Sequence, residues 1–419
     1  MSENKRTVDL AALSIAAERD LEGIFRELRL ISEKNTQKIL RIFKENKVST
    51  SHFMATDGYG YDDKGRDTLD RIYAEVFGVE AAFVRHSIAN GTHALAIGLY
   101  GLLRPGDVMY SVTGKPYDTL DEVINGSTGD GSLRDFGVEY DECQLKDGKI
   151  DLAVLEKTLC SERGKKIKVV YAQRSKGYLD RPTLTSDQIN EAARLVHSVS
   201  DAYFVCDNCY GEFTEEYEPY ECDLIIGSLI KNPGGGMADC GGYLAGSKRA
   251  VELASYRLTT PGVGLEVGAS IGQTKNMYKG LFYAPHTVSQ AIMTAHFAAY
   301  IFDGLGYETE PKWSERRSDI IQQVKLGTPE GLCAFCRGIQ YGSPVDAFVT
   351  PEPWAMPGYS DEVIMAAGTF CMGASIELSA DGPLRAPYTA FFQGGLTYES
   401  GKIGVLSAAE EVLKLREEK

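Results

Sequence analysis

The 419-residue chain lacks any apolar run of about 18 or more residues, the length that a helix needs to span a bilayer. It also lacks a surplus of basic charge, because 44 Lys and Arg face 59 Asp and Glu and leave a formal net charge of −15. A nucleic-acid footprint would favour a basic face, so we expect neither nucleic acid nor membrane as a partner. No apolar signal-peptide core follows residues 1–6, and we therefore expect a cytoplasmic protein.

Internal repeats and low-complexity segments are also missing, and a content of 43% hydrophobic and 25% charged residues is typical of a folded globular protein. The nine cysteines are odd in number and widely spread in a chain too large to need disulfides, so they are interpreted as reduced thiols. Cys206/Cys209 and Cys333/Cys336 have the C-x-x-C spacing of zinc ligands. Because the two pairs lie far apart in the sequence, we expect no metal site.

Helical and β-rich patterns divide the chain into three parts. Residues 1–50 have apolar positions at helical spacing and are expected to form an N-terminal helical arm for packing or subunit contacts. Residues 51–285 alternate short β-rich runs with helices, which predicts a large α/β domain whose mostly parallel sheet is covered on both faces. Residues 286–419 are expected to form a smaller α+β C-terminal domain. The expected strands cover residues 82–85, 108–112, 168–172, 203–206, 223–226 and 242–245.

Two of these strands end beside residues that suit a covalent cofactor. Lys231 follows the run at 223–226, and Asp207 ends the run at 203–206. Ligands of parallel sheets bind at the carboxyl ends of the strands. A lysine beside a cationic cofactor in a partly desolvated pocket has a lowered pKa and suits Schiff-base formation. A carboxylate on a neighbouring strand could keep a pyridine ring protonated. The alternative for Lys231 is an ordinary surface lysine before a glycine-rich loop.

A phosphate site is predicted where the strand at 82–85 gives way to a helix. The segment at 87–94 reads Ser-Ile-Ala-Asn-Gly-Thr-His-Ala, and Gly91 permits a close approach of the backbone. The amides of Gly91, Thr92 and His93 are expected to point out of the helix N-terminus, where the dipole favours an anion. The spacing is neither a Walker loop nor G-x-G-x-x-G, and Asn-Gly is often only a turn.

Several longer motifs resemble the bacterial aluminium-resistance proteins, a branch of the cystathionine β-lyase and methionine γ-lyase group. The likeness covers nearly the whole chain from about residue 20. It rests on the motifs Gly58-Tyr-Gly-Tyr-Asp-Asp-Lys-Gly-Arg-Asp-Thr-Leu-Asp, Gly91-Thr-His-Ala, Leu103-Arg-Pro-Gly-Asp, Gln173-Arg-Ser-Lys-Gly-Tyr, Asp207-Asn-Cys-Tyr-Gly-Glu-Phe, Gly227-Ser-Leu-Ile-Lys-Asn-Pro-Gly-Gly-Gly and Ile376-Glu-Leu-Ser-Ala-Asp-Gly-Pro-Leu-Arg. The resemblance implies the fold of fold-type I pyridoxal 5′-phosphate (PLP) enzymes, with a seven-stranded sheet, and a homotetramer built from dimers that share active sites.

Carried over to this sequence, the resemblance implies a catalytic set of Lys231, Tyr117 and Asp207. Lys231 would anchor the cofactor and move the substrate's Cα proton, Asp207 would pair with the pyridine nitrogen, and Tyr117 would stack on the ring. The implied cofactor contacts are Gly91, Thr92, His93, Gln173, Ser175, Tyr210 and Ser228, with Tyr59 or Tyr61 reaching over from a neighbouring subunit.

Two arginines are the expected substrate contacts. Arg385 is expected to bind the substrate's carboxylate, because a guanidinium matches it with two parallel hydrogen bonds, and Arg174 is the second candidate. The alternative for Arg385 is a structural salt bridge with Glu377 or Asp381. For Arg174 it is a carboxylate elsewhere. Where the known lyases send Tyr-x-Arg to the phosphate, this chain has Tyr-Gly-Tyr, with Arg66 five residues beyond Tyr61.

The resemblance implies carbon–sulfur bond cleavage in a cysteine- or methionine-like amino acid by β- or γ-elimination. An aminotransferase would use the same lysine and aspartate, and Tyr210 has the spacing from Asp207 found in that class. A PLP-binding, stress-linked protein without turnover is the third interpretation.

Overall fold

The computed structural model describes residues 9–356, 359 and 361–417, so expectations for residues 1–8, 357–358, 360 and 418–419 lie outside the described residues. The chain divides into two compact units. The central unit is Glu33–Pro285, and the terminal unit combines Met1–Ser32 with His286–Lys419. The boundary expected from the sequence between the large and the small domain is also at 285/286. Within the expected helical arm at 1–50, residues Leu10–Glu45 form one helix, α1, whose residues are shared between the two units.

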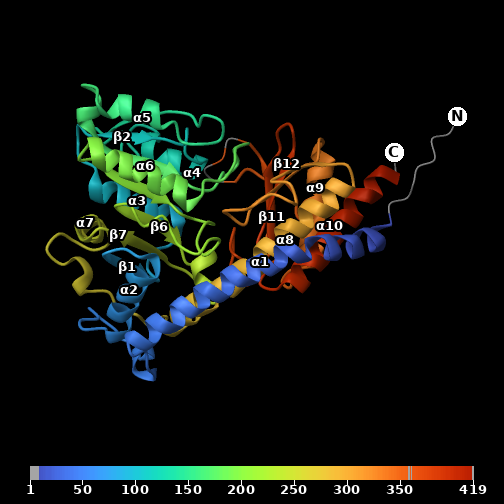
Figure 1. Ribbon diagram of the computed structural model, residues 1–419, viewed down its shortest axis with the longest axis horizontal. Coiled ribbons are helices and arrows are strands. Elements are labelled where there is room, and N and C mark those ends of the chain that lie inside the picture. Colours follow the sequence, from blue (N-terminus) through green and yellow to red (C-terminus); the bar gives the residue numbers. More distant parts are fainter. Residues whose placement is uncertain (1–8, 357–358, 360, 418–419) are drawn as a thin grey trace. The chain divides into compact units, whose positions relative to one another are not determined.

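A seven-stranded sheet organises the central unit (Figure 1). Its order is β1-β7-β6-β5-β4-β2-β3, and every neighbouring pair is parallel except the two that involve β7. The predicted mostly parallel sheet is therefore confirmed. The strands are β1 (Ala81–Arg85), β2 (Val108–Ser111), β3 (Glu139–Glu142), β4 (Ile167–Gln173), β5 (Tyr203–Asp207), β6 (Leu224–Ser228) and β7 (Gly242–Gly246).

Helices cover both faces of this sheet. Successive residues of a strand point in opposite directions, so neighbouring residues of β7 contact different helices. On β7, Tyr243 packs edge-on against Phe77 of α2, whereas the next residue, Leu244, lies under Gly98 of α3. A Cβ on Gly98 would come within 2.5 Å of Ile226, so glycine allows α3 to approach the sheet closely. The helices of this unit are α2 (Lys64–Phe77), α3 (Gly91–Leu102), α4 (Asp118–Asn125), α5 (Leu152–Leu159), α6 (Ser186–Val199) and α7 (Lys248–Leu258).

The outer strand β1 is tied to helix α2 by a buried carboxylate. Asp70 accepts a hydrogen bond from the backbone N–H of Val84 at 2.8 Å, and it also pairs with Arg85 at 2.7 Å. The short 3₁₀ turns of the central unit are η1 (Thr50–Phe53), η2 (Gly164–Lys166), η3 (Asn232–Gly234) and η4 (Gly264–Glu266). Of these, η3 is the one that matters for the site, because it begins immediately after Lys231.

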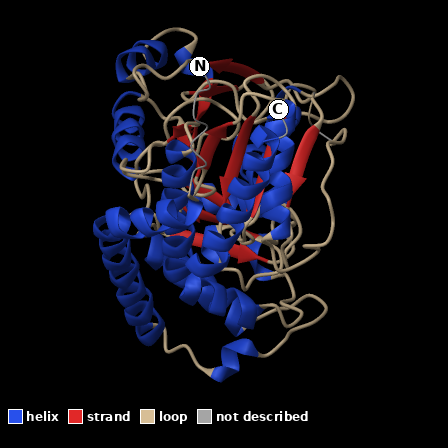
Figure 2. Ribbon diagram, turned by 90° about the vertical axis from the view of Figure 1, so that its right-hand side faces the viewer, coloured by secondary structure: helices blue, strands red, loops and turns tan. Residues whose placement is uncertain are grey.

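The terminal unit contains a five-stranded antiparallel sheet of order β10-β11-β12-β9-β8. Helix α9 packs on three of its strands and α10 packs on α9, and Figure 2 shows helices lying over strands near the C-terminus. The elements are β8 (Glu308–Glu310), β9 (Gln322–Lys325), α9 (Pro329–Tyr341), β10 (Val363–Ala366), β11 (Ser379–Pro383), β12 (Thr389–Gln393) and α10 (Tyr398–Glu417), with the long helix α8 (Thr274–Gly304) shared with the central unit. The predicted α+β character of this part is confirmed.

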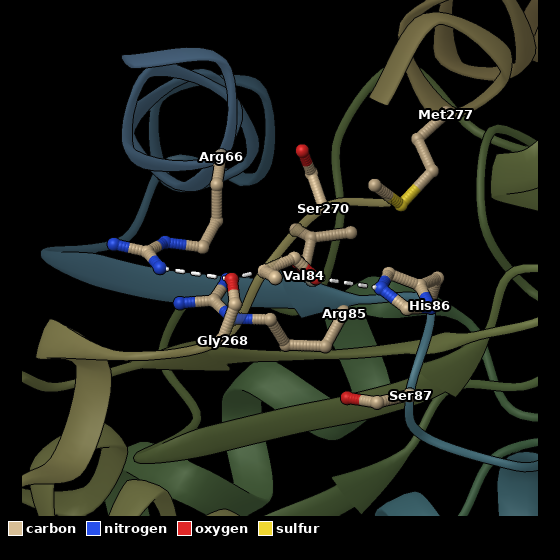
Figure 3. A pocket seen from close by; sticks show the side chains of 9 residues that line it. Arg66, Val84, Arg85, His86, Ser87, Gly268, Ser270 and Met277 are labelled. Carbon is tan, nitrogen blue, oxygen red and sulfur yellow. Dashed lines mark hydrogen bonds between the residues drawn. The ribbon is translucent and has the colours of Figure 1, made fainter. Parts of the chain in front are cut away.

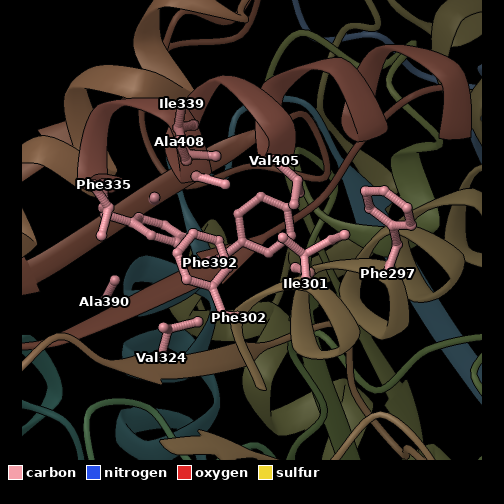
Figure 4. Close-up of a cluster of buried hydrophobic side chains, with 14 of the residues drawn as sticks. Phe297, Ile301, Phe302, Val324, Phe335, Ile339, Ala390, Phe392, Val405 and Ala408 are labelled. Carbon is pink, nitrogen blue, oxygen red and sulfur yellow. The ribbon is translucent and has the colours of Figure 1, made fainter. Parts of the chain in front are cut away.

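A continuous apolar core fills the terminal unit (Figure 4). Phe302 of α8 contacts Phe335 of α9 with ring centroids 4.9 Å apart, and Phe335 in turn meets Phe392 of β12 at 6.3 Å. Leu21 and Phe25 of α1 are at most 1% exposed and belong to the same core. The apolar face at the start of the chain is therefore used for packing. Among the described helices, none is long and apolar enough to cross a membrane.

Candidate active site

Four strands of the seven-stranded sheet have their carboxyl ends on the same side, which is called the carboxyl edge of the sheet below. β4, β5 and β6 are parallel, and they end at Gln173, Asp207 and Ser228. β1 runs in the same direction as β6, because both are antiparallel to the strand between them, β7. The turn after β1 therefore brings Gly91, the first residue of α3, to the carboxyl edge, which also carries Lys231.

Gly91 marks the point around which the site is built. A Cβ placed on Gly91 would lie 3.3 Å from Cys209 Sγ, 3.5 Å from Ser228 Cβ and 3.9 Å from Lys231 Nζ. Cys209 follows β5, whereas Ser228 ends β6 and Lys231 follows β6, so the fold has brought together residues of two neighbouring strands and the start of α3. Glycine at this position leaves room for a group larger than a hydrogen atom between them.

The N-terminus of α3 offers two backbone amides to an anion, where the sequence predicted three. The Asn90 side chain caps the helix by accepting a hydrogen bond from the His93 amide at 2.8 Å, and His93 Nδ1 accepts one from the Ala89 amide at 3.0 Å. The expected phosphate contact of the His93 amide is therefore wrong, because that amide already has a partner. The first amides of a helix have no intrahelical acceptor, which leaves those of Gly91 and Thr92.

A chain of hydrogen bonds fixes Tyr117 beside the helix N-terminus. The Tyr117 hydroxyl lies 3.0 Å from Thr92 Oγ1, and its backbone N–H donates to Gln173 Oε1 at 3.1 Å. The amide nitrogen of Gln173 donates to the Ser175 carbonyl at 2.9 Å. Both ends of the Gln173 side chain are thus engaged in holding the loops. Gln173 and the Ser175 carbonyl position Tyr117, which is a different role from the direct cofactor contact that was expected.

Asp207 and Lys231 form the charged centre of the site. Asp207 is 4% exposed and accepts a hydrogen bond from the Cys209 amide at 3.1 Å. Burial raises the pKa of Asp207, and the attraction of Lys231 opposes that rise. Lys231 Nζ lies over the Tyr210 ring, 4.1 Å from its centroid. Asp207 and Tyr210 both act on the charge of Lys231, so the three residues lie in one part of the site.

Opposing effects act on the pKa of Lys231. Burial lowers it, but the acidic groups of Cys209, Tyr210, Tyr117 and Asp207 together raise it well above the ordinary value. The expected lowering assumed a cationic cofactor beside the lysine, and the protein's own groups do not produce it. A cation bound beside Asp207 would have to lower it.

Ser228 completes a cradle that fits a phosphate. Its hydroxyl oxygen is buried and has no hydrogen-bond partner among residues 9–356, 359 and 361–417. A buried polar atom without a partner costs free energy, so this hydroxyl suits a ligand atom. The unpaired hydroxyl, the bare Gly91 and the helix amides fit a phosphate, while Lys231, Asp207 and Tyr117 suit the aldehyde, the pyridine nitrogen and the ring of PLP.

Sequence reasoning missed Asn232, the residue after Lys231. Its side-chain amide donates to the carbonyls of Tyr210 at 2.9 Å and Glu212 at 2.8 Å, so it joins the loop after β5 to the loop after β6. Tyr210 has a left-handed backbone with φ of +71°, which is uncommon for a residue with a side chain. The sequence Asn-Pro-Gly is typical of a turn, and nothing in it signals this clamp.

Cys209 was also missed, because it was considered only as half of a C-x-x-C pair. Its sulfur lies beside Gly91 and Lys231, and burial raises its pKa well above the ordinary value. No disulfide joins any of the nine cysteines, all of which lie within the described residues. Within the described part of the chain, no group of three His, Cys, Asp or Glu side chains is arranged to hold a metal ion. The one available signal was the position of Cys209 two residues after a strand-end aspartate.

Arg174 is corrected from a substrate contact to a structural residue. Its side chain is fully buried and pairs with Glu215 at 2.7 Å and Glu218 at 3.5 Å. It also donates to Asn208 Oδ1 at 2.7 Å and to the Leu184 carbonyl at 3.2 Å. The guanidinium is therefore used up in holding the loop after β5, as the alternative of a carboxylate elsewhere proposed.

Arg385 belongs to the terminal unit, on the segment that follows β11. It pairs with Asp361 at 2.9 Å, and the two side chains are 48% and 36% exposed. The structural alternative expected Glu377 or Asp381 as the partner. Glu377 is occupied instead by the amides of Phe370 and Cys371. An exposed ion pair of this kind is weak and can exchange its partner for a ligand carboxylate.

Tyr59 and Tyr61 project from the loop before α2. They are 72% and 62% exposed, and their rings stack with centroids 5.5 Å apart. Arg66 is 3% exposed and donates to the carbonyls of Gly60 at 2.7 Å and Gly268 at 2.9 Å. Arg66 therefore holds the loop that carries the tyrosines, while both tyrosine side chains are exposed.

The sheet order and the lysine and aspartate at adjacent strand ends define the class of fold-type I PLP-dependent enzymes. A fold-level likeness agrees: the PLP-dependent protein YhfS of Escherichia coli superimposes with a TM-score of 0.61 at 14% identity, covering 93% of this chain and 97% of that one. The chain belongs to the methionine gamma-lyase family, whose model matches residues 10–413.

Relatives support this assignment along nearly the whole length. The protein YnbB of Bacillus subtilis, described as uncharacterized, is 49% identical over 411 residues, which is 97% of each chain. A structure from Clostridium novyi, described as a carbon-sulfur lyase involved in aluminum resistance, has a TM-score of 0.92 at 46% identity and covers 96% of both chains. PLP is the cofactor that the family and the fold imply.

Proposed function

We propose that the protein is a PLP-dependent carbon–sulfur lyase that acts on a cysteine- or methionine-like amino acid. The observation that carries the proposal is the meeting of Lys231, Ser228 and Cys209 around the bare position of Gly91, with Asp207 close enough to influence the charge of Lys231. The name of the Clostridium novyi relative, a carbon-sulfur lyase, supports the same reaction class.

Bound at this site, PLP would supply an electron sink for the charge left at the substrate's Cα when its proton is removed. Lys231 Nζ would hold the cofactor's aldehyde carbon and, once the substrate's amino group replaces it, take the Cα proton. Asp207 would keep the pyridine nitrogen protonated, and that cation would in turn oppose the raised pKa of Lys231. Tyr117 would stack on the ring, held there by Thr92 and Gln173.

The phosphate would be bound by Ser228 Oγ and the amides of Gly91 and Thr92. The expected products are a thiol, ammonia and a 2-oxo acid, whether the sulfur leaves from Cβ or from Cγ. Arg385 would bind the substrate's carboxylate by leaving Asp361, which an exposed ion pair allows at little cost.

The assembly and location also belong to the proposal. We infer a cytoplasmic homotetramer, a dimer of dimers in which Tyr59 or Tyr61 contributes to the neighbour's phosphate site. The exposure of both tyrosines and the anchoring of their loop by Arg66 support this inference. Analytical ultracentrifugation together with mixing of Tyr59→Phe/Tyr61→Phe and Lys231→Ala subunits tests it, because shared sites would restore part of the activity in mixed oligomers.

Transamination is the second candidate, and the observation that favours it is the Tyr210 ring at 4.1 Å from Lys231 Nζ. The deciding experiment supplies sulfur amino acids to the PLP-loaded protein and follows thiol and 2-oxo acid. A lyase releases both without a second substrate. Turnover that requires an added 2-oxo acid would assign an aminotransferase, and a protein that binds PLP but turns over no amino acid would be the stress-linked alternative.

A further inference from the structure

A hollow lies where β1 ends, bounded by α2, by the segment 268–270 and by α8 (Figure 3). Its cavity volume is about 20 Å³, and the empty space grows to about 260 Å³ when the part open to solvent is counted. The sheet edge, the helix and the loop all deliver polar groups to it. The lining residues are Arg66, Val84, Arg85, His86, Ser87, Gly268, Ala269, Ser270 and Met277.

Arg85, the last residue of β1, is the central side chain of this hollow. It is 4% exposed, and one nitrogen, Nη1, makes all of its hydrogen bonds: two to the carboxylate of Asp70 at 2.7 and 2.9 Å, and one to the Val84 carbonyl at 2.8 Å. Nε and Nη2 are buried and have no partner in the described ranges 9–356, 359 and 361–417.

The unpaired nitrogens of Arg85 form the edge of the guanidinium that recognises oxyanions. Nε–H and one Nη2–H are parallel donors, and their spacing matches the two oxygens of a carboxylate or of a tetrahedral oxyanion. Nη1 fixes the plane of the group, so this edge is already oriented before a ligand arrives. Gly268 lies beside this edge, because a Cβ on it would be 3.8 Å from Nε.

The charges around the hollow agree with an anion. Arg66 brings a second guanidinium, although its own donors are taken by Gly60, Gly268 and Asp67. The nearby carboxylate of Asp70 is committed to Nη1 on the far edge. Since a buried charged donor without a partner is costly, water alone would satisfy the Arg85 edge less well than an anion.

We propose that this hollow binds a small oxyanion, a free carboxylate or an inorganic oxyanion, on the Nε/Nη2 edge of Arg85. The site uses none of the residues assigned to PLP, so it stands whether or not the lyase proposal holds. In a chain with a net charge of −15, it is a local exception to the acidic character.

Crystals of the PLP-loaded protein soaked in selenate test the proposal directly, because selenium gives an anomalous signal. A peak within hydrogen-bond distance of Arg85 Nε and Nη2 is the expected result. The same peak is expected to persist in Arg71→Lys, a change at an exposed arginine of α2 outside the hollow, and to be lost in Arg85→Lys. Water density in place of selenium at Arg85, at a soak that gives selenate peaks elsewhere, overturns the proposal.

Calorimetric titration of the PLP-loaded protein with sulfate and with acetate separates inorganic oxyanions from carboxylates in solution. Arg85→Lys is expected to weaken the binding of whichever anion is preferred by about 10-fold or more, because a charge-assisted pair of hydrogen bonds is lost. Arg71→Lys serves as the control, because it changes an exposed arginine outside the hollow. If Arg85→Lys and Arg71→Lys bind the anion equally well, the anion binds elsewhere and the proposal is wrong.

Discussion

Two groups of buried charge lie at the same edge of the seven-stranded sheet, and they differ in how completely their polar atoms are paired. Around Arg174, the guanidinium meets Glu215, Glu218 and Asn208. Around Lys231, the Ser228 hydroxyl has no partner within the described ranges. Both groups are held by loops that follow parallel strands, so position on the sheet does not distinguish them.

The difference shows how a structural network can be told from a binding site. Burying a charge costs several kcal/mol unless its hydrogen bonds are made, and the Arg174 network makes them within the chain. The Lys231 site leaves donors and a hydroxyl for a group that the chain does not supply. A buried charged side chain whose hydrogen bonds are all made within the chain, such as Arg174, stabilises the fold. A buried charged side chain beside polar groups that lack hydrogen-bond partners, such as Lys231 beside Ser228, is a candidate to bind a ligand.

Among the substitutions that test this comparison, Lys231→Ala is expected to have the largest effect. Turnover of sulfur amino acids is expected to fall by about 10³- to 10⁴-fold, because the anchoring amine and the proton carrier are lost together. Steady-state assays with added PLP measure it. Lys168→Ala is the matched control, because Lys168 also lies over a tyrosine ring, that of Tyr203 at 4.8 Å, but on another strand. Equal losses in the two variants would contradict the assignment.

Replacing Arg174 tests the structural network in this comparison. Arg174→Met is expected to lower the free energy of unfolding by about 3–5 kcal/mol, because it strands the buried carboxylates of Glu215 and Glu218. Urea unfolding measures the loss. Arg194→Met breaks an exposed pair with Glu221 and is expected to cost less than about 1 kcal/mol. If the Arg174→Met protein is stable but has a raised KM, Arg174 contacts the substrate and the structural assignment is wrong.

Glu212 is influenced by members of both groups, Glu218 and Lys231, and makes the comparison dependent on pH. Burial, followed by repulsion from Glu218, raises the pKa of Glu212 from its ordinary 4.5 to about 8. Its carboxyl group is therefore protonated in the folded protein at neutral pH. The stability that it contributes is complete below the unfolded pKa and is lost as pH rises from 4.5 through about 8, on the order of a few kcal/mol.

Urea unfolding at several pH values across this window measures the effect of Glu212. Glu212→Gln is expected to remove the pH dependence, and Glu216→Gln, a change at an exposed neighbour, is expected to keep it. The pKa assignment fails if the two variants show the same slope of stability against pH.

Ser228→Ala is expected to have the smallest effect. The sign of its effect on stability distinguishes an unpaired hydroxyl from a paired one. Without PLP, removing an unpaired buried hydroxyl is expected to leave stability unchanged or raise it by up to about 1 kcal/mol. With PLP, affinity is expected to fall about 10-fold, since a hydrogen bond to a charged group is lost. Ser111→Ala removes a hydroxyl that donates to the Gly114 carbonyl and is expected to destabilise by about 1 kcal/mol. Thermal unfolding and PLP titration separate the two outcomes.

Much of the fold follows from local pattern. Six strands of the large sheet are predictable because they are apolar runs bounded by helices, and Lys231 and Asp207 come together because parallel strands end at one edge. Strand β3 was missed, because its sequence Glu-Tyr-Asp-Glu is polar and its place is the edge of the sheet. Apolar periodicity finds buried strands and passes over exposed ones.

Pairing in space is what the sequence could not supply. Arg174 looked like a site residue because it follows a strand end, but its partners Glu215 and Glu218 reach it through a loop bent by the left-handed Tyr210 and Phe213. The Asn90 cap that occupies the His93 amide, and the clamp of Asn232 on two carbonyls, depend likewise on geometry between segments. Residue type and spacing identify candidates, and hydrogen-bond partners decide among them.

The hydrogen bond from the Val84 amide to Asp70 bears on self-association. β1 is an outer strand of its sheet, and outer strands offer free backbone groups on which foreign strands can pair and aggregate. Here a carboxylate of α2 already takes the Val84 N–H, and the same carboxylate orients Arg85. One aspartate therefore both blocks strand addition at the sheet edge and prepares the anion hollow, so Asp70→Ala is a change that would expose the protein to aggregation and weaken that hollow at once.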